Sequence, residues 1–104
     1  MSTSGGEYNV RQYHLMLARL GQYRAGYLSL AQLVSDLEAL GAALESPAQP
    51  WLAEFEPAWG MLEDVHASLL AEGRSQPGET ERGLIERAVA RLSSLIETEI
   101  ARRG

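Results

Sequence analysis

Glu63 and His66 are the residues best spaced for chemistry, because they form the only Glu-x-x-His pair in the chain. On a helix this spacing puts both side chains on adjacent turns of one side, where they could share a metal ion. Carboxylate-bridged di-iron bundles use two such pairs and two further glutamates. The second histidine, His14, has Arg11 three residues before it. The sequence therefore favours a hydrogen-bonded histidine in or beside the core, and we expect no metal site.

Paired carboxylates could act as a general acid and base if two of them met in a cleft. The acidic residues of the central segment are instead spread around one expected helix, at Glu54, Glu56, Glu63 and Asp64. The chain has no cysteine, and it contains neither a nucleophile elbow nor a glycine-rich phosphate loop. We therefore expect no catalytic residue and no cofactor, and we interpret the protein as non-enzymatic.

Formal charge is segregated along the chain, which has a net charge of −5. All nine arginines lie in the two end segments. Every charged residue between positions 25 and 73 is acidic, namely Asp36, Glu38, Glu45, Glu54, Glu56, Glu63, Asp64 and Glu72. Such a surface repels nucleic acid and acidic membranes, and it accelerates encounter with a basic protein. We expect a basic protein partner, and neither nucleic acid nor a membrane.

Four segments carry apolar residues at helical spacing, at about 9–25, 30–45, 50–72 and 81–102. Short connections between them predict an all-α four-helix bundle, antiparallel, in a single domain from 9 to 104 after a flexible leader at 1–8. The main apolar stripe lies on the third helix and comprises Trp51, Phe55, Trp59, Leu62, His66 and Leu69. No apolar run is long enough for a membrane span, and Met1–Gly6 lacks signal-peptide features, so we expect a soluble cytoplasmic protein.

Local signals set the expected ends of these helices. Asn9, Ser29 and Thr80 are the predicted N-caps of the first, second and fourth helices. Pro57 lies inside the third helix, which is therefore either kinked there or begun near that residue. We favour a kinked, continuous helix because the apolar spacing keeps its phase across the proline.

The outer face of the second helix is small and uncharged, with Gln32, Ser35, Ala39, Ala42 and Ala43. Two interpretations stay open: alanine is simply a good helix former, or another backbone approaches closely here. The second would allow a homodimer, so Ser35 and Ala39 are candidate partner-binding residues. A small-ligand pocket lined by the aromatic stripe is a third hypothesis, to which we prefer a filled core.

A small, acidic, cysteine-free chain with four expected helices resembles the immunity proteins that bacteria pair with toxins, most nearly the four-helix inhibitors of colicin-type nucleases. The similarity lies in size, charge and helix count. The paired tyrosines on a short third helix that mark those inhibitors are absent, so no residue is carried over. The resemblance implies an acidic face that blocks the basic cleft of a toxin domain. From the residues themselves, the candidate acidic face comprises Asp36, Glu38, Glu54, Glu56, Glu63 and Asp64.

Overall fold

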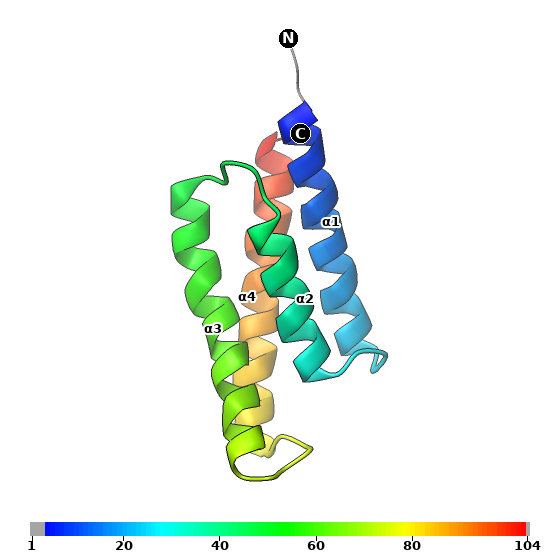
Figure 1. The fold of residues 1–104 in the computed structure, drawn as a ribbon, viewed down its shortest axis with the longest axis vertical. Coiled ribbons are helices and arrows are strands. Elements are labelled where there is room, and N and C mark those ends of the chain that lie inside the picture. Colours follow the sequence, from blue (N-terminus) through cyan, green and yellow to red (C-terminus); the bar gives the residue numbers. More distant parts are fainter. Residues whose placement is uncertain (1–3, 104) are drawn as a thin grey trace.

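Four helices run alternately up and down in the computed structural model, which describes residues 4–103 (Figure 1). They are α1 (Ser4–Arg24), α2 (Leu30–Ala42), α3 (Gln49–Ala71) and α4 (Glu79–Arg103). Each helix packs against the next along the chain, and α4 closes the ring by packing against α1. The predicted all-α, antiparallel four-helix bundle is confirmed.

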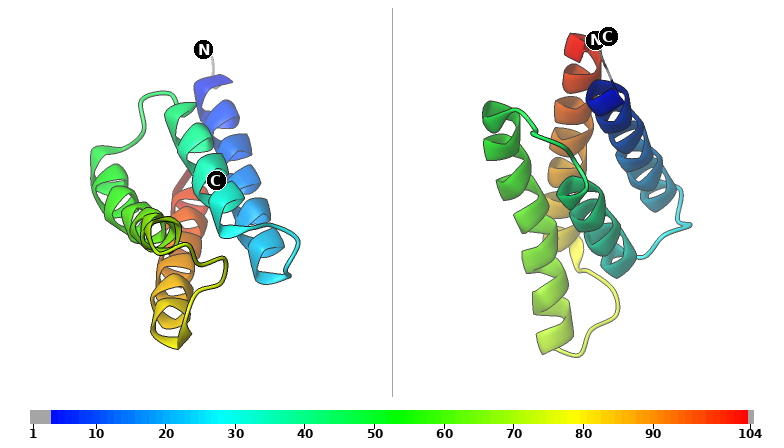
Figure 2. Two further views of the ribbon diagram at one scale, coloured as in Figure 1. Left: turned by 60° about the horizontal axis from the view of Figure 1, so that its bottom comes forward. Right: turned by 45° about the horizontal axis from the view of Figure 1, so that its top comes forward.

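The bundle is elongated, with extents of 52 × 25 × 19 Å. Helices α3 and α4 are longer than α2, so they continue as a two-helix hairpin beyond the loop that joins α1 to α2 (Figures 1 and 2). The beginning of α1 and the end of α4 lie together at the opposite end (Figure 2). Among the described residues, no helix is both long enough and apolar enough to cross a membrane.

One hydrophobic cluster draws buried side chains from all four helices. The stripe expected on the third helix faces this cluster, although Trp59 and His66 are only half-buried. The indole Nε1–H of Trp51 donates to the carbonyl of Leu95 on α4 at 3.1 Å, and that of Trp59 donates to the carbonyl of Val34 on α2 at 3.0 Å. The two tryptophans therefore attach α3 to both of its neighbours.

A serine before α2 and two prolines within α3 test the helix ends that the sequence predicts. Ser29 caps α2 as predicted, since its hydroxyl accepts the Gln32 N–H at 3.1 Å. Helix α3 begins at Gln49 with Pro50 in its first turn, where a missing N–H is harmless. It runs unbroken through Pro57, so the alternative of a helix that begins there is wrong.

Two predicted caps are wrong. Helix α1 begins at Ser4 rather than Asn9, so it includes residues 4–8, which the sequence assigned to the leader. Residues 1–3 of the expected leader lie outside the described residues. Helix α4 begins at Glu79, so Thr80 already lies inside it. There the carboxylate of Glu81, the third residue of the helix, accepts the Gly78 N–H at 2.6 Å, as the glutamate of a capping box does.

A candidate protein-binding face on α2 and α3

Part of the acidic central segment is neutralised within the fold. The Asp36 carboxylate on α2 lies 3.1 Å from the guanidinium Nε of Arg19 on α1. Glu54 on α3 pairs with Arg91 on α4, and Glu72 pairs with the arginine that follows α3. The fold thus brings arginines of the two end segments beside three of the eight central carboxylates.

The other four acidic candidates remain available to a partner. Glu38, Glu56, Glu63 and Asp64 are exposed, and none of them makes an ion pair with another residue of the described range 4–103. Glu56 and Glu63 are seven residues apart, so they project from one side of α3, about 10 Å apart along its axis. Asp64 projects about 100° further around the helix. The acidic face thus narrows to Glu38, Glu56 and Glu63, with Asp64 at its margin.

A groove of about 420 Å³ lies between α2 and α3 within this acidic face. Glu38 borders it from α2 and Glu56 borders it from α3. The rest of its lining is mainly apolar or small and includes Gly41, Leu52, Trp59 and Gly60. Ligand pockets in proteins occupy about 300–1,000 Å³, so this groove has room for one or two apolar side chains.

Local packing keeps this groove open and its floor fixed. The hydrogen bond from Trp59 to the Val34 carbonyl holds the indole against α2. At Gly41 a Cβ atom would lie 3.4 Å from the ring of Phe55, so the bare backbone lets that ring approach α2 closely. At Gly60 a Cβ atom would meet nothing within 4 Å. The α2 wall at Gly41 is therefore in contact with Phe55 of α3, whereas the space beside Gly60 on the α3 wall is open.

The small residues of α2 lie beside this groove. Ser35, Ala39 and Ala42 are exposed, and Ala42 also contributes to the groove lining. The structure thus brings Ser35 and Ala39 next to the unpaired Glu38 on one exposed side of α2. Asp36, by contrast, is turned toward α1 by its ion pair with Arg19.

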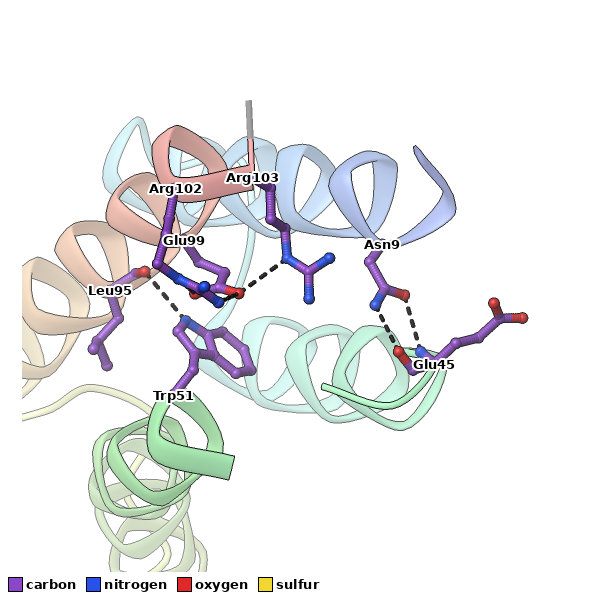
Figure 3. A network of polar contacts seen from close by, with 7 residues as sticks. All are labelled: Asn9, Glu45, Trp51, Leu95, Glu99, Arg102 and Arg103. Atoms are coloured by element: carbon purple, nitrogen blue, oxygen red, sulfur yellow. Dashed lines mark hydrogen bonds and ion pairs between the residues drawn. The ribbon is translucent and has the colours of Figure 1, made fainter. Parts of the chain in front are cut away.

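A second polar cluster lies where the chain ends meet (Figure 3). Glu99 on α4 is only 4% exposed, and its carboxylate accepts hydrogen bonds from Arg102 at 2.6 Å and Arg103 at 2.9 Å. Burial raises the pKa of Glu99, but the two arginines outweigh it and lower the pKa overall. The Arg103 guanidinium also lies 5.5 Å from the ring centroid of Tyr13. The Glu99 carboxylate is thus paired within its own helix, and these contacts fasten the end of α4.

Asn9 belongs to the same end of the bundle and joins α1 to the segment after α2 (Figure 3). It is 2% exposed. Its side-chain Nδ2 donates to the Glu45 carbonyl at 2.7 Å, and its Oδ1 accepts the Glu45 N–H at 2.9 Å. The Glu45 side chain itself points away from Asn9 (Figure 3).

The structure gives no support to a metal or aromatic ligand site. Within residues 4–103, no three histidine, aspartate or glutamate side chains are grouped so that they could hold a metal ion. Trp51 stacks on Phe55 with ring centroids 4.8 Å apart and contacts Tyr13 edge-on at 5.1 Å, so these rings fill the core. His66 lines a separate groove between the α1–α2 and α3–α4 loops.

Gly41 and Gly60 line the groove, but the sequence patterns did not predict them as parts of a site. A signal was present, because a glycine inside a helix costs about 1 kcal/mol relative to alanine and therefore suggests a special environment.

Comparisons with protein-family models, with curated proteins and with solved structures find no match to this chain. A function for this protein therefore has to be inferred from its geometry and charge.

Proposed function

We propose that this protein is a non-enzymatic binding module whose α2–α3 face docks on a basic partner protein. Its most specific form is an immunity-type inhibitor that acts in the cytoplasm of a bacterium and covers the basic cleft of a toxin domain. The observation that carries the proposal is an open, mainly apolar groove bordered by Glu38 and Glu56, with Glu63 two turns further along α3. All three carboxylates are exposed and have no ion-pair partner among residues 4–103.

The physical mechanism has two parts. Uncompensated carboxylates on one face attract a basic surface over several ångströms and so raise the rate of encounter, an effect that salt screens. After encounter, close packing of the groove and its rim excludes water and substrate from the covered cleft. No bond is made or broken in this mode of inhibition.

A matched pair of charge reversals tests the proposal. Protein captured from the native host on the immobilised chain is purified, and its association rate is measured over a range of ionic strength. Glu56→Lys removes a charge from the proposed face, whereas Glu97→Lys makes the same charge change at an exposed position of α4, which does not pack against α2.

We expect Glu56→Lys to slow association by about three- to tenfold at low salt and to flatten its salt dependence, while Glu97→Lys leaves both nearly unchanged. The triple variant with Glu38→Lys and Glu63→Lys added should slow association further. Equal effects of Glu56→Lys and Glu97→Lys would show that net charge alone matters, and the proposed face would be wrong.

The alternative proposal is a homodimer through the exposed small residues of α2, Ser35, Ala39 and Ala42. In a two-fold contact there, Glu38 of each copy would approach the acidic face of the other copy. Repulsion between these like charges opposes tight association. Sedimentation at several concentrations separates the proposals. A monomer throughout supports a hetero-partner, and a tight dimer disrupted by Ala39→Arg supports the alternative.

A further inference from the structure

The groove between α2 and α3 combines an apolar floor with a charged rim, and this combination restricts what can occupy it. The floor includes Leu52 and Trp59, and the rim carries Glu38 on one helix and Glu56 on the other. An apolar group in the groove therefore lies between two carboxylates that have no cation of their own among residues 4–103. An occupant that is both apolar and basic satisfies both features.

The acidic side chains continue along α3 at helical spacing. Glu63 lies two turns beyond Glu56 on the same side of α3, about 10 Å away along the axis. A helix laid along α3 presents side chains seven residues apart at that same spacing. Recognition by addition of a strand would require a sheet edge, and residues 4–103 form helices, turns and loops only.

We infer that the α2–α3 groove seats an amphipathic basic helix of the partner protein, with one or two apolar side chains in the groove and lysines or arginines against Glu38, Glu56 and Glu63. The inference rests on the proposed function and narrows it to one seat and one kind of partner segment. It also gives Gly60 a role, since a larger side chain there would project into the space that the partner occupies.

Gly60 offers a direct steric test. Because a Cβ at Gly60 would meet nothing within 4 Å, Gly60→Met should fold and should fill part of the groove. Gly21→Met is the control, since Gly21 is also helical and its Cβ would also meet nothing within 4 Å, but it lies on the exposed surface of α1. Thermal unfolding by circular dichroism verifies that both variants fold.

The probe is a synthetic amphipathic peptide of about four helical turns, with leucines on one face and lysines beside them. Its binding to the unmodified protein is measured by calorimetry, together with two peptides in which alanine replaces leucine or glutamate replaces lysine. We expect the leucine–lysine peptide to bind, and both substituted peptides to bind at least about tenfold more weakly. Gly60→Met should weaken binding by about tenfold or more, and Gly21→Met should leave it unchanged.

The outcomes separate this inference from the function on which it rests. If Gly60→Met binds the leucine–lysine peptide as well as the unmodified protein does while Glu56→Lys does not, the acidic face is supported and the groove is not the site where the helix binds. If neither change alters binding, both proposals fail. No binding of the leucine–lysine peptide, or equal binding of the leucine-free peptide, overturns the inference. Self-association that Gly60→Met abolishes would identify the occupant as a second copy and overturn it as well.

Discussion

Substituting Asn9 distinguishes two roles that one asparagine can have. As an N-cap, which the sequence predicts, Asn9 would tolerate aspartate, and replacement by alanine would cost about 1 kcal/mol. In the structure its amide instead both donates to and accepts from the backbone of Glu45, in a site that is 2% exposed. The second role predicts that Asn9→Asp destabilises the fold, because a carboxylate cannot donate the hydrogen bond that Asn9 makes to the Glu45 carbonyl.

The magnitude follows from these two hydrogen bonds. Asn9→Ala removes both and leaves the Glu45 N–H and carbonyl, in a part-buried site, without these partners, which should lower the free energy of unfolding by about 2–3 kcal/mol. Asn9→Asp keeps the bond from the Glu45 N–H but sets a carboxylate oxygen against the Glu45 carbonyl. We expect a loss of about 2 kcal/mol or more at neutral pH, which becomes smaller in acid as the introduced carboxyl is protonated and can donate.

Urea denaturation followed by circular dichroism measures these losses. With a slope of about 1–3 kcal/mol per molar urea, a loss of 2 kcal/mol moves the midpoint by about 0.7–2 M. The control is Glu45→Ala, which keeps the backbone groups that Asn9 binds and should change the stability by less than about 0.5 kcal/mol. An Asn9→Asp variant as stable as the unmodified protein would refute the second role and favour the cap.

Three further predictions concern other parts of the fold. Gly60→Ala should raise the free energy of unfolding by about 0.5–1 kcal/mol in urea denaturation, because it restores helix propensity in open space; a loss would mean that the site is crowded. Trp59→Phe should lower that free energy by about 1 kcal/mol through the missing bond to the Val34 carbonyl, and an unchanged midpoint would contradict that bond. Burial raises the pKa of Glu99, but its arginine partners lower it overall, so its stabilisation is present above the ordinary glutamate pKa of about 4.3 and is lost as pH falls through the lowered value. Stability measured from neutral pH into acid should therefore fall less steeply for Glu99→Gln, and parallel curves would rule this out.

The second and third helices could be predicted from the sequence because their signals are local. Ser29 stands directly before an unbroken apolar stripe, and the structure confirms it as the cap of α2. On α3 the apolar residues keep their phase through Pro57, and the helix is continuous. Where apolar period and capping residue agree over one segment, they determine the element without knowledge of the rest of the fold.

Asn9 was misinterpreted because its partner lies 36 residues away in the chain. An asparagine before an apolar run is a cap signal in the sequence, and the same side chain forms long-range bonds in the fold. The burial of Glu99 could not be predicted either, because arginines three and four residues later indicate ion pairs on a helix but not burial.

The candidate face was predictable only in part. Counting charges along the chain identified Glu38, Glu56, Glu63 and Asp64, which the fold leaves exposed. It could not reveal that Asp36 meets an arginine of α1, since that pairing depends on how the helices pack. The same holds for Glu54, which pairs with Arg91 of α4.

The most direct test of a docking face on α2 and α3 is a backbone amide NMR titration with the leucine–lysine peptide, read at four glycines on three different sides of the bundle. Gly41 and Gly60 line the groove, whereas Gly21 lies on α1 and Gly83 lies on α4. We expect the signals of Gly41 and Gly60 to shift with added peptide while those of Gly21 and Gly83 stay in place. Shifts that are largest at Gly83, or equal at all four glycines, would contradict the account.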